Sequence, residues 1–176
     1  IFLISLSASL LVWTNKLTLL VAFIGFIIAC FYPLAKRFFP IPQVFLGIAF
    51  SWGVLMVAAA ELEKITFISM IIFGACFFWI LAYDTAYAMS DKEDDLSIGI
   101  KSSAITFGKI TQKVILTFHL LSLVLWVFCA YLESLNEVFY LSILICLILV
   151  FFQFKLLKDG DRDKCFLAFK RNNWIG

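Results

Sequence analysis

The stretch ITFISMIIFGACFFWILAYDTAYAM, residues 65–89, decides the fold class of this chain. Residues 65–83 contain no charged side chain, and the apolar residues run continuously instead of alternating with polar ones. A transmembrane helix needs about 20 mostly apolar residues, whereas a membrane barrel strand needs about ten residues of alternating polarity. The stretch therefore predicts a helix that spans a membrane.

Comparable apolar runs cover most of the remaining chain, at about 1–14, 17–33, 43–60, 112–132 and 138–154. The 176 residues are 64% hydrophobic and 15% charged, against about 45–50% and about 25% in soluble domains. A soluble core of this size could not bury so much apolar surface. We expect an all-α, polytopic transmembrane helix bundle that forms one domain over residues 1–176.

The two ends of the sequence predict that the domain continues on both sides. Ile1 opens inside an apolar run, with no basic region or cleavage site typical of a signal peptide. Residues 172–176 resemble the start of another helix. Pro33, Pro40 and Pro42 are expected to end one helix and to shape the entry of the next.

Lysine and arginine are distributed unequally between alternate loops. Loops 34–42, 90–111 (taken to Lys113) and 155–171 hold twelve of the 14 basic residues, which leaves Lys16 and Lys64 for the other side. Cytoplasmic loops of membrane proteins carry such an excess. We therefore expect these three loops on the cytoplasmic side of the membrane.

Residues 83–95, YDTAYAMSDKEDD, carry the acidic groups that could perform chemistry. If the helix continues past Met89, Asp84, Asp91 and Asp95 span only about 40° of its circumference, and Tyr87 points the same way. Carboxylates stacked at this spacing repel one another. Mg²⁺ typically takes one or two carboxylates together with substrate phosphate, so Asp91 and Asp95 are candidate metal ligands.

Asp84 strengthens this interpretation, because an acid at membrane depth is costly and marks a functional site by default. The alternative is a solvated acidic helix end, since charge runs are usually surface. Lys36, Arg37 and Lys101 lie on the same predicted side, where an arginine fork and lysine charges could hold phosphate oxygens. Ordinary positive-inside flanking remains the alternative for these three residues.

Two blocks, YPLAKRFFPIPQVFLGIAFSWG (32–53) and YDTAYAMSDKEDDLSIGIKSSA (83–104), resemble the UbiA superfamily of intramembrane prenyltransferases. The likeness covers essentially the whole chain and is strongest to the members that act on 4-hydroxybenzoate. The resemblance implies about nine helices and two Asp-rich motifs. Asp91 and Asp95 match the second motif, the first would precede Ile1, and the six runs would be helices three to eight. The isolated fragment is expected to be inactive.

The resemblance further implies an enzyme that transfers a polyprenyl group from its diphosphate to position 3 of 4-hydroxybenzoate, in ubiquinone biosynthesis. Mg²⁺ would bind between the Asp motifs, and Asp91, Asp95 and Arg37 would serve catalysis. Substrate contacts would come from Lys36, Arg37, Tyr87, Lys101 and Asp84. Tyr83, Trp79 and Phe78 are further candidates to steady a cation. The expected partners are these two substrates and the bilayer, with no nucleic acid and no obligate protein partner. The resemblance implies a bacterial inner (plasma) membrane, with the Asp-rich loop on the cytoplasmic side.

Three other interpretations remain open. The chain could be a family member with a different acceptor. It could be a cation transporter that uses Asp84 and Asp91, which predicts carboxylates on several helices near mid-membrane. It could also be a non-catalytic membrane scaffold, for which the replacement of Asp91 and Asp95 by asparagine would have no effect.

Overall fold

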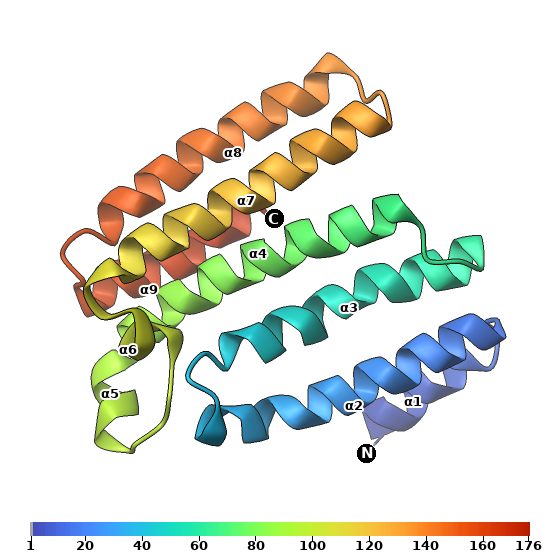
Figure 1. The fold of residues 1–176 in the computed structure, drawn as a ribbon, viewed down its shortest axis with the longest axis horizontal. Helices are drawn as coiled ribbons and strands as arrows, with labels where there is room; N and C mark the ends of the chain where they lie inside the picture. The colour runs from blue at the N-terminus through green and yellow to red at the C-terminus, as the bar shows by residue number, and fades with distance from the viewer. Residues whose placement is uncertain (1) are drawn as a thin grey trace.

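A computed structural model describes residues 2–176, and within that range the regular structure is entirely helical (Figure 1). The longer helices are α1 (Phe2–Leu11), α2 (Lys16–Phe38), α3 (Gln43–Leu62), α4 (Phe67–Ser90), α7 (Thr111–Leu132), α8 (Glu137–Leu156) and α9 (Arg162–Arg171). Shorter pieces are α5 (Lys92–Ser97), α6 (Ser103–Phe107), η1 (Gly108–Ile110) and η2 (Asn172–Trp174). The predicted all-α bundle is confirmed.

Five helical segments within residues 2–176 are long and apolar enough to cross a membrane: Lys16–Phe38, Gln43–Leu62, Phe67–Ser90, Ser103–Leu132 and Glu137–Leu156. They correspond to five of the six predicted apolar runs. The run expected at 1–14 forms α1, whose 10 residues are about half the length that a span requires.

The spanning helices lie side by side in the order α2, α3, α4, α7, α8, as Figure 1 shows. Small side chains fill the contacts around α4, α7 and α9, where Ala82, Ala86, Cys165 and Ala168 are almost completely buried. Small residues let membrane helices approach closely. Many large apolar side chains are exposed instead, which matches a lipid environment.

Pro33 does not end a helix, contrary to the sequence-based expectation. It lies inside α2, which continues to Phe38 and carries Lys36 and Arg37 in its last turn. Proline is tolerated inside membrane helices because neighbouring groups satisfy the backbone carbonyl that it leaves free. The first basic loop is therefore shorter than predicted.

The other two predicted loops contain helices. Residues 90–111 form α5, α6 and η1, and residues 162–171 form α9. The Asp161 side chain accepts the Lys164 N–H at 2.9 Å and caps the start of α9. Ten residues make a marginal helix in isolation, so the packing of α9 against α4 explains why it forms.

The connections sort to two ends of the bundle. The α2–α3 connection, α5, α6 and the α8–α9 connection share one end, and the α3–α4 and α7–α8 turns lie at the other (Figure 1). The three segments rich in lysine and arginine therefore lie at the same end of the molecule. The candidate acidic residues lie there too.

Candidate functional site

Asp84, Asp91 and Asp95 form an acidic face that lies across the junction of α4 and α5. Helix α4 ends at Ser90, one residue past Met89, and Asp95 belongs to the next helix, α5. The hydrogen-bond pattern nevertheless persists, because the Asp95 N–H donates to the Asp91 carbonyl at 2.9 Å. The Asp91 N–H donates to the Tyr87 carbonyl at 3.2 Å. Tyr87, Asp91 and Asp95 consequently remain one helical turn apart.

Three charged groups act electrostatically on Asp84. The Lys36 ammonium of α2 attracts its carboxylate, while the Asp91 and Asp95 carboxylates repel it. The three predicted carboxylates therefore interact electrostatically with one another, and Lys36 of α2 interacts with them from another helix. Asp84 sits six residues before the end of α4, deeper in the bundle than the other two.

Lys36 and Asp91 also act electrostatically on the Asp95 carboxyl. Partial burial raises the pKa of the Asp95 carboxyl, the Ser102 side chain and the Lys36 charge oppose this rise, and the Asp91 and Asp94 charges add to it. Unfavourable negative charge of this kind is relieved by a cation. The Asp91–Asp95 pair is therefore a place where added positive charge is favourable.

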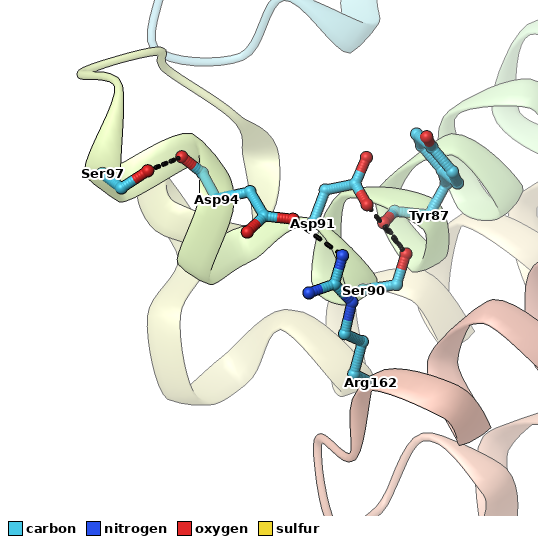
Figure 2. Close-up of polar contacts among 6 residues, drawn as sticks. All are labelled: Tyr87, Ser90, Asp91, Asp94, Ser97 and Arg162. Carbon is cyan, nitrogen blue, oxygen red and sulfur yellow. Dashed lines mark hydrogen bonds and ion pairs between the residues drawn. The ribbon is translucent and has the colours of Figure 1, made fainter.

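Figure 2 shows the surroundings of Asp91 and Asp94. The Ser90 hydroxyl donates to the Tyr87 carbonyl at 2.6 Å and lies 3.5 Å from an Asp91 carboxylate oxygen. Asp94 points to another element, where the Arg162 guanidinium at the start of α9 donates to it at 2.7 Å. Asp94 is thus engaged by protein, whereas no described residue forms a salt bridge with Asp91 or Asp95.

The end of α2 supplies the basic side of the site. Lys36 is half-buried, and its ammonium lies 5.7 Å from the ring centre of Tyr32. Tyr32 also lies near Tyr83, Asp84 and Tyr87 of α4. Sequence reasoning did not single out Tyr32, although its spacing of four residues from Lys36 places both on one helix face.

Arg37 and Lys101 occupy different positions from Lys36. Arg37 is exposed in the last turn of α2 and forms no salt bridge with a residue of the described chain. The Lys101 ammonium donates to the Phe38 carbonyl at 3.0 Å, and its backbone N–H donates to the Lys36 carbonyl at 3.3 Å. Lys101 therefore caps α2 and fixes the segment after the acidic face against it.

Comparison with known proteins gives the same assignment as the two sequence blocks. The profile of the UbiA prenyltransferase family matches residues 1–174. The chain belongs to this family. It is 43% identical over 174 residues to a 4-hydroxybenzoate octaprenyltransferase of Nitrosospira multiformis, covering 98% of the chain and 60% of that protein. It is 39% identical over 171 residues to one of Aeromonas hydrophila, covering 97% and 60%.

A solved structure has the same fold as this UbiA family member. The apo structure of a UbiA homolog from Aeropyrum pernix K1 matches 96% of the chain and 62% of its own length, with a TM-score of 0.75 and 23% identity. The chain spans about 60% of the length of the curated relatives that it matches.

Aromatic side chains line the side of the acidic face that α9 covers. The Tyr87 ring centre lies 5.0 Å from that of Phe169 and 6.3 Å from that of Phe166. Tyr83 contacts Phe169 at 6.0 Å and Trp79 at 5.2 Å. Phe78 instead packs near Phe118 of α7. Of the predicted aromatic candidates, Tyr83 and Tyr87 lie at the site and Phe78 lies away from it.

The residues of this UbiA family member fit a magnesium ion. Within residues 2–176, no group of three His, Cys, Asp or Glu side chains could hold a metal ion alone. Mg²⁺ does not require such a group, because one or two carboxylates plus substrate phosphate and water satisfy it. Asp91 and Asp95 supply that number of carboxylates, and the charge around Asp95 favours a cation.

Proposed function

We propose that this protein transfers a polyprenyl group from polyprenyl diphosphate to position 3 of the 4-hydroxybenzoate ring, in ubiquinone biosynthesis. The supporting observation is that Lys36, in the last turn of α2, acts electrostatically on Asp84 and Asp95 of α4 and α5. Arg37 follows Lys36, and Asp91 lies at the same end of the bundle. The names of the relatives from Nitrosospira multiformis and Aeromonas hydrophila support the acceptor and the donor.

Asp91 and Asp95 would hold Mg²⁺, which when bound neutralises negative charge on the leaving diphosphate. Lys36 and Arg37 add fixed positive charge for the same diphosphate or for the acceptor carboxylate. Asp84 would attract the Lys36 ammonium towards the site. In this proposal the acidic groups bind the metal ion and the basic groups bind the anionic parts of the substrates.

In the reaction, the allylic carbon–oxygen bond to the diphosphate breaks and a carbon–carbon bond forms ortho to the phenol oxygen. The ring then loses the proton from the carbon that was attacked. The electron-rich faces of Tyr83 and Tyr87 lie where a cation could be steadied. The polyprenyl tail would extend into the bilayer between helices, which accounts for an enzyme built inside a membrane.

The site would face the cytoplasm of a bacterial inner membrane, according to the lysine and arginine excess at that end. We also propose that residues 1–176 alone are inactive, because the relatives extend well beyond the matched region. A family member with another acceptor is the nearest alternative. The transporter alternative predicts carboxylates inside several spans, whereas within residues 2–176 only Asp84 lies more than one turn inside a span.

The test uses membranes that contain the complete protein, supplied with 4-hydroxybenzoate, a polyprenyl diphosphate and Mg²⁺. Mass spectrometry should detect 3-polyprenyl-4-hydroxybenzoate. An Asp91→Asn/Asp95→Asn double variant should lose at least roughly a hundredfold in rate, because the charge stabilisation of the leaving group is gone. Removal of Mg²⁺ by a chelator should have the same effect.

Glu93→Gln is the control, since Glu93 is an exposed acid of the same segment. It should retain most of the activity. No product from well-folded protein would refute the acceptor, and other aromatic or lipid acceptors would then be assayed. Product formation that is undiminished in the double variant would refute the assigned metal ligands.

A further inference from the structure

A cavity of about 260 Å³ opens at the same end of the bundle as the acidic face, but on another side of α4. The junction of α4 and α5, the turn between α6 and α7, and the α8–α9 connection enclose it. Three lysines lie in its wall, one from each of these segments: Lys92, Lys109 and Lys158. Neither Asp91 nor Asp95 contributes to its lining.

The charge of this basic cavity is positive despite one acid in its wall. Asp159 lines the cavity, but its carboxylate accepts the Lys164 ammonium at 2.9 Å, and this contact lowers the pKa of Asp159. Across the described residues 2–176, no carboxylate forms a salt bridge with Lys92, Lys109 or Lys158. Three ammonium groups are thus available for an anion.

An apolar groove of about 430 Å³ lies between the outer faces of α7 and α8. Its wall includes Leu116 of α7 and Leu147, Phe151 and Phe154 of α8, and it is almost free of polar surface. Within residues 2–176, α8 is the outermost spanning helix on this side of the bundle (Figure 1). Among the described helices, the groove therefore lies on an outer, apolar face of the bundle.

The basic cavity and the apolar groove follow one another along the same pair of helices. Gln112 lines the cavity, and Leu116, one turn further along α7, lines the groove. The Gln112 side chain donates to the Phe154 carbonyl at 2.7 Å, so the two hollows meet at this hydrogen bond. At the end of α8 the same succession runs from Leu157, the residue that follows the helix, in the cavity to Phe154 in the groove.

We propose that an anionic phospholipid binds here, with its headgroup phosphate among Lys92, Lys109 and Lys158 and one acyl chain in the groove between α7 and α8. Basic pockets between helices on the cytoplasmic side of membrane proteins bind anionic headgroups in this way. A soluble phosphate would use only the cavity and would leave the apolar groove without a role. A phospholipid accounts for both features, because its phosphate would neutralise the lysines of the cavity and its acyl chain would cover the apolar groove.

The test measures lipid retention by native mass spectrometry of the complete protein, purified in a neutral detergent and titrated with phosphatidylglycerol or phosphatidylcholine. One equivalent of phosphatidylglycerol should bind at least about tenfold more tightly than phosphatidylcholine, because each lysine near a headgroup contributes to the attraction. The triple variant Lys92→Gln/Lys109→Gln/Lys158→Gln should lose this preference. Each variant is first checked for an unchanged melting temperature in detergent.

The matched control is Lys101→Gln/Lys113→Gln/Lys170→Gln, which removes the same charge from residues outside both the cavity and the groove. It should keep the preference for phosphatidylglycerol. Equal losses in both triple variants would show general charge attraction and would overturn the proposed site. An unchanged preference in the cavity triple variant would overturn it as well.

A second pair of variants tests the acyl chain. Ile148→Trp fills the groove and should weaken phosphatidylglycerol binding several-fold, whereas Ile145→Trp changes a similarly exposed residue of α8 that lies outside the groove. Equal phosphatidylglycerol binding by the two variants would contradict the proposal that an acyl chain occupies the groove. Competition by inorganic phosphate as effective as that by phosphatidylglycerol would assign the cavity to a soluble anion instead.

Discussion

Neighbouring basic residues at the end of α2 have different surroundings. Lys36 is half-buried and engaged by the field of Asp84 and Asp95, while Arg37 is exposed without a salt-bridge partner in the described part of the chain. A guanidinium in this position can form paired hydrogen bonds to a carboxylate or phosphate, which an ammonium cannot. We therefore propose Arg37 as the anchor for an anionic substrate group and Lys36 as part of the charge balance.

Arg37→Gln should lower kcat/KM by roughly tenfold to a hundredfold, since hydrogen bonds to a charged group contribute about 1.5–3 kcal/mol. Arg37→Lys should recover only part of this loss. Separate titrations of the diphosphate and of 4-hydroxybenzoate will identify the substrate whose KM rises, and hence the group that Arg37 binds. Lys16→Gln, at the opposite end, serves as the control, and an Arg37→Gln variant as active as this control would contradict the anchor.

Between elements, one contact joins the acidic segment to α9. Arg162 pairs with Asp94, and both side chains are 60% exposed. An exposed ion pair contributes only about 0–1 kcal/mol to stability. Because α5 is a helix of 6 residues, we propose that the pair positions the segment that carries Asp95, with little effect on overall folding.

Arg162→Gln and Asp94→Asn should each raise the Mg²⁺ concentration for half-maximal activity a few-fold and leave the melting temperature nearly unchanged. In a double-mutant cycle the two effects should not add. Lys164→Gln with Asp159→Asn removes a comparable exposed pair away from the acidic face and provides the control. Additive effects, or equal effects of the control pair, would show that the contact does not position α5.

The packing of α2 on α3 depends on a glycine. Trp52 of α3 donates its indole N–H to the Val21 carbonyl at 2.8 Å, and its ring lies where a Cβ atom on Gly25 would be placed. An added methyl group at Gly25 would collide with this ring, whereas nothing lies within 4 Å of the corresponding position at Gly53. The two glycines form a matched pair for the same substitution.

Gly25→Ala should destabilise the protein by about 1–3 kcal/mol, the usual cost of overpacking, and should lower the melting temperature in detergent by several degrees. Gly53→Ala should have no effect or raise stability slightly, because alanine favours helix over glycine. Thermal unfolding followed by circular dichroism will compare the two variants. Equal melting temperatures would mean that Trp52 moves without cost.

For the molecule as a whole, the two ends of the bundle differ in charge. The end that carries the acidic face also carries the segments with most of the lysines and arginines, and the α7–α8 turn lies at the other end (Figure 1). This arrangement agrees with the orientation expected from the charge bias. It remains a proposal that the end with the acidic face is cytoplasmic.

Orientation can be measured with single cysteines in a variant whose five native cysteines are replaced. A membrane-impermeant maleimide added to intact spheroplasts should label Ser134→Cys in the α7–α8 turn and should not label Ser97→Cys at the end of α5. Both positions are exposed. Lysis should make Ser97→Cys reactive, which serves as the control. The opposite labelling pattern would reverse the proposed orientation.

Several features follow from the sequence because they depend on local periodicity and on lipid solubility. Continuous apolar runs are soluble only in lipid, and there the backbone must satisfy its own hydrogen bonds, so helices result. The spacing of Asp91 and Asp95 survives the break at Ser90, because backbone hydrogen bonds still connect residues four apart. The two motif blocks also indicated the family, which the profile match confirms.

Other features depend on contacts between distant segments, which no local pattern encodes. Only tertiary packing places Lys36 and Tyr32 against Asp84, and only the free carbonyls at the end of α2 assign Lys101 to capping. Helix α9 forms because α4 buries Cys165 and Ala168. The sequence by itself determined the helices and the four-residue spacing of Asp91 and Asp95. The tertiary structure decided which side chains surround these carboxylates, because helix packing brings together residues far apart in the chain.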